Sequence, residues 1–331
     1  KNIFDFQFAN GSDNLFYSRR IGRSPQGSVS KTADAYVDQP NNTVILGAAR
    51  LSGKTKNGWS LGLLETVTDN MFAKIIDNGE ESKQRVEPMT NYLVGRAQKD
   101  FNSRMSYVGA IITATHRDLG ANFQYLREAA YSGGVDFMHN WQDRKYYLTG
   151  NFVASNVQGS KEAISATQSD ITHLFIRSDA SHIALDTSRT MLAGTGGKLE
   201  IGKATGIWLY DGGFIWRSPE LELNDIGFLR QADEIRQYLN LTGQFQTPTD
   251  WYRGTSINLG QYTTYDFEGN LNRLQFNLKG DVNFKNNWEV GVNMIHKPLI
   301  NINTYLRGGP RWRFSEENGI FLSAGSDRRK K

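Results

Sequence analysis

Apolar and polar residues alternate along much of the chain, most clearly between Leu271 and Met294. From Leu274 to Phe284, every second position is a large apolar residue or glycine, and the positions between them carry charged or amide side chains. After the turn residues Lys285-Asn286-Asn287, the alternation resumes from Trp288. A period of two places successive side chains on opposite faces of a strand. Two such runs joined by a tight turn predict an antiparallel hairpin.

Less regular versions of the same pattern predict roughly a dozen strands, of about the ten-residue length that a tilted strand needs to cross a bilayer. The predicted strands are Thr43–Ser52, Trp59–Leu64, Asn91–Gln98, Met105–Thr115, Tyr131–Phe137, Lys145–Ala154, Lys198–Tyr210, Ile235–Phe245, Ser256–Tyr265, Leu271–Phe284, Trp288–Met294 and Asn303–Phe314. Between them we predict a hairpin loop over Ser52–Gly58, a long, charged, exposed loop over Asp69–Pro88 and a short helix over Ser160–Ser169.

One apolar face, one face with charges of both signs, and aromatic residues near the turns are the arrangement of an antiparallel transmembrane β-barrel with a polar lumen. We therefore predict an all-β fold with a single barrel domain over residues 1–331. A soluble all-β carbohydrate-binding protein also alternates in this way and stays open as an alternative. Its aromatic platforms would be Trp59, Trp141, Trp208 and Trp216.

Composition narrows the functional classes. The 331 residues include 38 Lys plus Arg and 34 Asp plus Glu, and this net charge of +4 is too small to indicate a nucleic-acid partner. The absence of cysteine excludes disulfides and thiolate metal sites. No apolar run approaches the ~18 residues of a membrane helix. A mean hydropathy of −0.53 is compatible with a barrel, because only every second residue of its strands faces lipid.

Three short motifs resemble catalytic or cofactor signatures without matching them. Gly47–Thr55 has five residues, where a phosphate-binding loop has four, before its Gly-Lys, and no helix is predicted after it. His116–Leu119 resembles a kinase catalytic loop but lacks the accompanying motifs. Gly194–Gly197 precedes a predicted strand and is interpreted as a flexible turn. The five histidines lack metal-binding spacing.

These motifs predict no cofactor, no metal and no recognisable catalytic group. A glycan hydrolase stays open as an alternative, because sequence cannot give the distance between two carboxylates that such an enzyme requires.

Clusters of arginine, several beside acidic or aromatic residues, are the candidate functional residues. Inside a barrel, arginine needs a carboxylate or backbone partner, and such pairs stiffen the lumen or set its selectivity. A salt-bridged wall without a ligand is the simpler hypothesis, and a specific anion or glycan site is the other. The candidate lumenal polar cluster consists of Arg19, Arg20, Arg23, Arg177, Asp179, Arg217, Arg273, Lys279 and Asp281.

An ordered set of segments resembles DUF5916, a barrel domain of large outer-membrane proteins common in Bacteroidota, which follows a carbohydrate-binding family 9-like domain. The segments are Phe16–Arg23, Ile45–Thr55, Asn57–Gly62, Pro88–Arg96, Trp216–Pro219, Asn224–Leu229 and Leu306–Pro310. The resemblance implies a Gram-negative outer-membrane barrel in contact with lipid. The resemblance supplies no catalytic residue. Because the alternation is regular and the carboxylates form no recognisable pair, we expect a passive pore, uptake component or surface scaffold for glycans or other nutrients.

The two ends of the chain differ from the full pattern of that family. The chain begins where the barrel portion would begin, its first six residues contain no signal-peptide core, and Ser326–Lys331 does not form an aromatic-ended final strand. We therefore expect a portion of a larger barrel, without the upstream sugar-binding domain and the later strands. Its sheet would have two unpaired edges.

Overall fold

The computed structural model describes residues 3–6, 8, 13–29 and 35–326, and the fold is all-β and antiparallel. The predicted absence of a closing strand at the C-terminal end concerns residues 327–331, which lie outside the described residues. The strands are β1 (Tyr36–Asp38), β2 (Ile45–Lys54), β3 (Trp59–Thr68), β4 (Met71–Asp77), β5 (Glu80–Glu87), β6 (Thr90–Phe101), β7 (Ser106–Arg117), β8 (Arg127–Trp141), β9 (Tyr146–Gly159), β10 (Met191–Lys203), β11 (Trp208–Arg217), β12 (Glu234–Phe245), β13 (Tyr252–Tyr265), β14 (Leu271–Phe284), β15 (Glu289–Ile302), β16 (Trp312–Phe314) and β17 (Glu317–Gly325). The helical segments are α1 (Lys161–Ser169) and the 3-10 turns η1 (Ser18–Arg20), η2 (Asn102–Arg104) and η3 (Ala121–Phe123).

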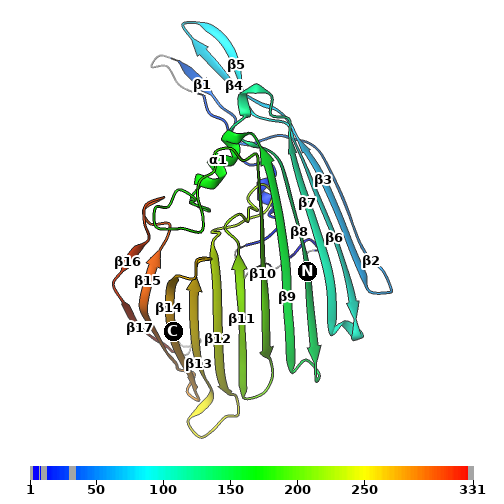
Figure 1. Ribbon diagram of the computed structural model, residues 1–331. Helices are drawn as coiled ribbons and strands as arrows, with labels where there is room; N and C mark the ends of the chain where they lie inside the picture. Colours follow the sequence, from blue (N-terminus) through cyan, green and yellow to red (C-terminus); the bar gives the residue numbers. More distant parts are fainter. Residues whose placement is uncertain (1–2, 7, 9–12, 30–34, 327–331) are drawn as a thin grey trace.

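Fourteen strands form one large sheet in which sequence neighbours pair from β6 to β15. A separate three-stranded sheet, β1-β4-β5, projects from one end of it (Figure 1). Short hairpins such as β8–β9 and β14–β15 share the opposite end, whereas the longer connections gather near the small sheet. Within the described residues, β2 pairs only with β3 and β17 only with β15, so the large sheet has two open edges.

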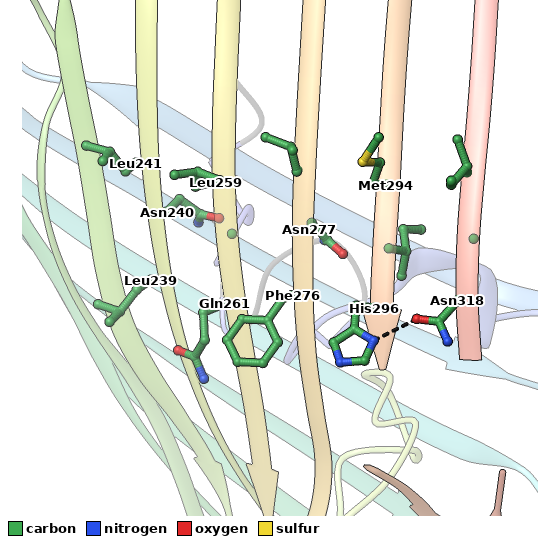
Figure 2. A pocket seen from close by; sticks show the side chains of 15 residues that line it. Leu239, Asn240, Leu241, Leu259, Gln261, Phe276, Asn277, Met294, His296 and Asn318 are labelled. Carbon is green, nitrogen blue, oxygen red and sulfur yellow. Dashed lines mark hydrogen bonds between the residues drawn. The ribbon is translucent and has the colours of Figure 1, made fainter. Parts of the chain in front are cut away.

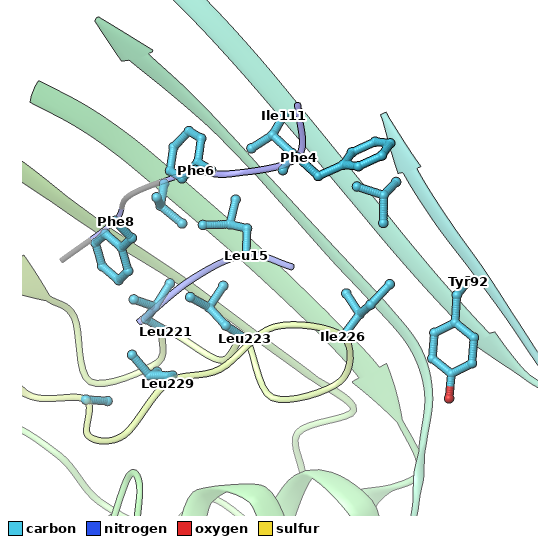
Figure 3. Packing of buried hydrophobic residues seen from close by; sticks show 13 residues of the cluster. Phe4, Phe6, Phe8, Leu15, Tyr92, Ile111, Leu221, Leu223, Ile226 and Leu229 are labelled. Atoms are coloured by element: carbon cyan, nitrogen blue, oxygen red, sulfur yellow. The ribbon is translucent and has the colours of Figure 1, made fainter. Parts of the chain in front are cut away.

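The inner face of the sheet is the face on which the N-terminal segment packs. Phe4, Phe6, Phe8 and Leu15 are buried there together with the loop that joins β11 to β12 (Figure 3). The wall beneath them is apolar, and Val153 on β9 is fully buried. This hydrophobic core therefore has three layers: the sheet, the N-terminal segment and the β11–β12 loop.

Inward-facing glycines make room for the three phenylalanines. A methyl group added at Gly134 would lie 2.7 Å from the ring of Phe6, and one added at Gly196 would lie 2.6 Å from the ring of Phe8. An arginine side chain lies over each ring at 5.3–5.8 Å, within the range of a cation–π contact. The matched sets are Phe4 with Gly62 and Arg50, Phe6 with Gly134 and Arg96, and Phe8 with Gly196 and Arg217.

The helix predicted over Ser160–Ser169 is confirmed as α1. The side chain of Ser160 caps it by accepting a hydrogen bond from the amide of Ala163 at 3.0 Å. Ile164 of the helix is fully buried against Phe175 and Leu192, which closes a second core cluster at the loop end of β9 and β10. No helix in the described part of the chain is long and apolar enough to cross a membrane.

Most of the predicted strands are confirmed, but three regions differ from the prediction. Asp69–Pro88 is not a loop, because it forms the hairpin of β4 and β5. The single strand predicted over Lys198–Tyr210 is wrong, because residues 204–207 turn the chain between β10 and β11. Asn303–Phe314 is mostly turn, and only its last three residues form β16.

Gly194–Gly197 was predicted to be a flexible turn, and that prediction is wrong. These residues lie inside β10, where Gly194 faces inward and touches the β11–β12 loop. An added methyl group at Gly194 would overlap the backbone of Glu220 and Leu221. Gly194 is thus required by close approach of two backbone segments and not by a bend, and Gly196 makes room for the ring of Phe8.

We expect Gly194→Ala to destabilise the protein by about 1–3 kcal/mol, because the overlap is with backbone and cannot be relieved by a rotamer change. Urea unfolding monitored by tryptophan fluorescence would measure this loss. Gly47→Ala on β2 is the matched control, because no atom lies within 4 Å of its added methyl group. Equal stability of the two variants would contradict the packing argument.

Candidate functional site

The outer face of the large sheet is apolar and exposed. Leu51, Leu63, Ile112, Val135 and Leu239 are each about half exposed or more, with values of 74%, 48%, 60%, 53% and 56%. Each alternates along its strand with inward residues that are polar or buried. Exposed apolar surfaces of this extent mark sites that are covered by another phase or partner.

A hollow of 680 Å³ lies on this outer face across β12–β17 (Figure 2). Two cross-strand rows of outward side chains line it. The apolar row consists of Leu241, Leu259, Leu278, Met294 and Ile320. The neighbouring row is more polar and consists of Leu239, Gln261, Phe276, His296 and Asn318. In that row, Asn318 and Nδ1 of His296 are 2.7 Å apart, so the polar atoms bond to each other on the apolar surface.

Aromatic residues gather toward both ends of the outer face. At the hairpin end, the rings of Trp141 and Tyr146 stack at 5.7 Å, and Trp208 meets Phe245 at 5.9 Å. Toward the loop end, Trp216 contacts two phenylalanine rings. The apolar surface is therefore bordered by amphipathic rings on two sides.

A network of buried charges joins the loop end of β7 and β8 to the β11–β12 loop. Arg117 pairs with Asp225 at 2.7 Å, and Arg127 pairs with the same carboxylate at 2.9 Å and with Glu222 at 3.4 Å. Nε2 of His173 lies within hydrogen-bond distance of the Glu222 carboxylate, 3.1 Å from its Oε2. Burial alone would raise the pKa of Glu222, but the charge of Arg127 and the hydrogen bond from His173 outweigh it and lower that pKa to about 2.

A polar cavity of 410 Å³ opens beside this network. Arg20, Arg127, Asp170 and Asn224 line it, together with the ring of Tyr125. Arg20 is held by its own bonds to the Gly227 carbonyl at 3.0 Å and to Asn224 at 2.9 Å. The cavity combines donors and acceptors of both charges, which suits a small polar molecule or ordered water.

We expect Glu222→Gln to lower the free energy of unfolding by about 3 kcal/mol at neutral pH, because the variant removes a buried anion that contacts Arg127 and His173 and leaves Arg127 with Asp225 alone. The pKa of Glu222 is lower in the folded state than its ordinary value of 4.5, so its contribution is present above that value and is lost as pH falls toward 2. The free energies of unfolding of the wild type and the variant should therefore approach each other as the pH falls into the acid range. Urea titrations at pH 7 and pH 3 test this, with the exposed Asp186→Asn as control, and an equal gap at both pH values would contradict it.

A second network ties several loops together around Arg177. Its guanidinium lies 3.3 Å from Asp179, 3.4 Å from Asp233 and 3.9 Å from Asp266. Arg311 reaches Asp179 from the β15–β16 connection at 3.4 Å. These contacts join the loops after β9, β11, β13 and β15.

Arg217 lies apart from that network, at the end of β11. It is buried between Asp13 of the N-terminal segment, at 2.5 Å, and Glu234 of β12, at 2.8 Å. The pair with Asp13 fastens the N-terminal segment to the wall. Its position explains why the arginine of the Trp216–Pro219 segment is buried.

The remaining members of the predicted cluster lie elsewhere. Arg19 is exposed, and the carbonyl of half-buried Arg23 accepts a hydrogen bond from the amide of Thr43. Arg273 is exposed at the loop end of β14, while Lys279 and Asp281 form an exposed pair at 3.3 Å nearer the hairpin end. The structure thus distributes the nine residues over several places, and the ion pairs among them are Arg177 with Asp179 and Lys279 with Asp281.

The candidate cluster predicted from the sequence does not include the residues of the Arg117 network. Arg117 is the last residue of β7 and Arg127 the first of β8, so their neighbourhood follows from the hairpin. Their pairing with a loop about a hundred residues later left no local signal.

The chain was compared with models of known protein families. A model of the family described as "Domain of unknown function (DUF5916)" matches residues 8–331. The chain therefore belongs to the DUF5916 family. Its fold is all-β and antiparallel. No curated protein matches it.

Proposed function

We propose that the large sheet is the membrane-spanning wall of an outer-membrane β-barrel in Gram-negative bacteria. Its outer face contacts lipid, and its inner face lines a polar interior through which small solutes pass. The role is passive: a pore or uptake component, linked to the handling of glycans or other nutrients. The observation that carries this proposal is the continuous exposed apolar face.

The height of the apolar face supports the proposal. On β14, the outward residues are apolar or glycine from Leu274 to Phe284, which is roughly 33 Å along the strand at about 3.3 Å per residue. A strand tilted by about 40° would then cover roughly 25 Å of bilayer, the height of the apolar band in such barrels. Charged outward residues such as Lys99 and Lys203 lie at the hairpin end.

The connections between strands differ in length at the two ends of the sheet, and this difference also supports the proposed barrel. Outer-membrane barrels have short turns on the periplasmic side and longer loops outside. Here the hairpins are short at one end, and the other end carries α1, the β1-β4-β5 sheet and both buried charge networks. The loop end would accordingly face the exterior.

Reconstitution into liposomes tests the proposal. We expect the protein to resist extraction by alkaline carbonate, to require detergent for solubility, and to let a neutral polyol such as sorbitol leave the vesicles. A protein that stays monomeric and folded in buffer without detergent would overturn the membrane assignment. A protein that inserts but transports nothing would leave a scaffold role in place of a pore.

A further inference from the structure

The inner face of the large sheet is divided into a covered half and an open half. Over β6–β9, the inward residues Val94, Ile111 and Val153 are at most 1% exposed, because the N-terminal segment and the β11–β12 loop lie on them. Asn151 is also buried there, and its side chain donates to the carbonyl of Phe8 at 3.1 Å. This covering layer is fixed by Asp13, through its pair with Arg217.

The inward residues of β12–β15 lack that cover, and most of them are half buried. They are mainly amides and hydroxyls that bond to one another across strands and along a strand. Asn258 donates to Thr242 at 2.7 Å, and Gln275 donates to Asn277 at 2.9 Å. The uncharged polar residues on this half include Asn240, Thr242, Ser256, Asn258, Tyr262, Gln275, Asn277 and Asn293.

A cavity of 530 Å³ lies at the loop end of these same strands. Arg236, Thr264, Arg273 and Asn301 are among the residues that line it. Arg236 and Arg273 lie at the loop end of this half, and the Lys279–Asp281 ion pair lies across the strands from Asn258 and Ser256. The side chains between the two arginines and this pair are uncharged and can both donate and accept hydrogen bonds.

We propose that the N-terminal segment and the β11–β12 loop form a fixed plug on one half of the wall, and that small neutral polar solutes pass along the amide-lined face of β12–β15. The proposal rests on the membrane-barrel function proposed above and names its solute class. Amide side chains form hydrogen bonds with hydroxyl groups and supply no net charge to compensate an ion, so an amide-lined path favours polyols over ions of similar size.

The absence of cysteine makes a single-cysteine test possible. Asn258→Cys, Asn151→Cys and Leu259→Cys place one thiol on the open path, under the plug and on the outer face, respectively. Each variant in liposomes is treated with a charged, membrane-impermeant methanethiosulfonate reagent, and sorbitol efflux is measured before and after. We expect Asn258→Cys to react about tenfold or more faster than Asn151→Cys, whose site must open locally before it can react. Its modification should reduce sorbitol efflux several-fold.

The outcomes separate this proposal from the one on which it rests. Equal labelling of Asn151→Cys and Asn258→Cys, or unchanged efflux after modification of Asn258→Cys, would overturn the plug and path. Rapid labelling of Leu259→Cys by the aqueous reagent would instead overturn the lipid-facing assignment of the outer face. If Asn258→Cys does not fold, Asn277→Cys on the next strand takes its place, with the same expected result.

Discussion

Ile257→Arg should prevent or strongly weaken folding into a bilayer, while Ser256→Arg on the same strand should be tolerated. Ile257 faces outward in the apolar band and is 41% exposed, and Ser256 faces the polar interior. An arginine on the lipid face near the bilayer midplane costs about 2–4 kcal/mol. The measurement is the free energy of folding into vesicles, from urea titrations of the two variants.

Ile257→Arg should change the stability very little if water, and not lipid, covers the outer face. Replacing a half-exposed isoleucine by arginine on a wetted surface changes stability by only about 0.5 kcal/mol. The inward Ser256→Arg would then be the more harmful change, because it places a large charged side chain in a narrower space. The order of the two variants therefore decides between a lipid-facing sheet and a soluble one, and it does not depend on any assay of transport.

Sequence alone predicted the strands well where one face is apolar and the other polar. β14 and β12 were predicted with nearly their observed bounds, because a period of two survives in any sheet that separates two environments. The prediction was wrong where the two faces of a strand do not differ in polarity. β4 and β5 carry charges on both faces, so Asp69–Pro88 resembled a loop.

The inner layer could not be predicted from local pattern. Phe4, Phe6 and Phe8 alternate as in a strand, yet their partners are glycines of strands distant in the sequence. The ion pairs have the same property: Arg217 meets Asp13 across 204 positions. Contacts of this kind depend on the register of the whole sheet, which single-residue patterns do not encode.

Arg177→Met should cause one of the largest losses of stability available in the loops, about 3–5 kcal/mol at neutral pH. The substitution keeps much of the side-chain volume and removes the cation that Asp233 and Asp266 share. Both carboxylates are buried, and burial already raises the pKa of Asp233 although Arg177 and His182 lie beside it. Without the arginine, Asp266 keeps Arg311 at 3.8 Å and Asp233 keeps its hydrogen bond with His182, so their charges are only partly compensated.

The pH dependence identifies the mechanism of that loss. A carboxylate that has lost its cation is easier to protonate, and a protonated acid needs no counterion, so the deficit of Arg177→Met should narrow as pH falls through the acid range. Arg189→Met is the matched control, because Arg189 pairs with Asp186 at 3.4 Å on the exposed surface, where such pairs contribute about 0–1 kcal/mol. A loss of unfolding free energy that stays constant with pH would mean that Arg177 acts through packing of its alkyl chain. The four loops would then be held together by van der Waals packing and not by ion pairs.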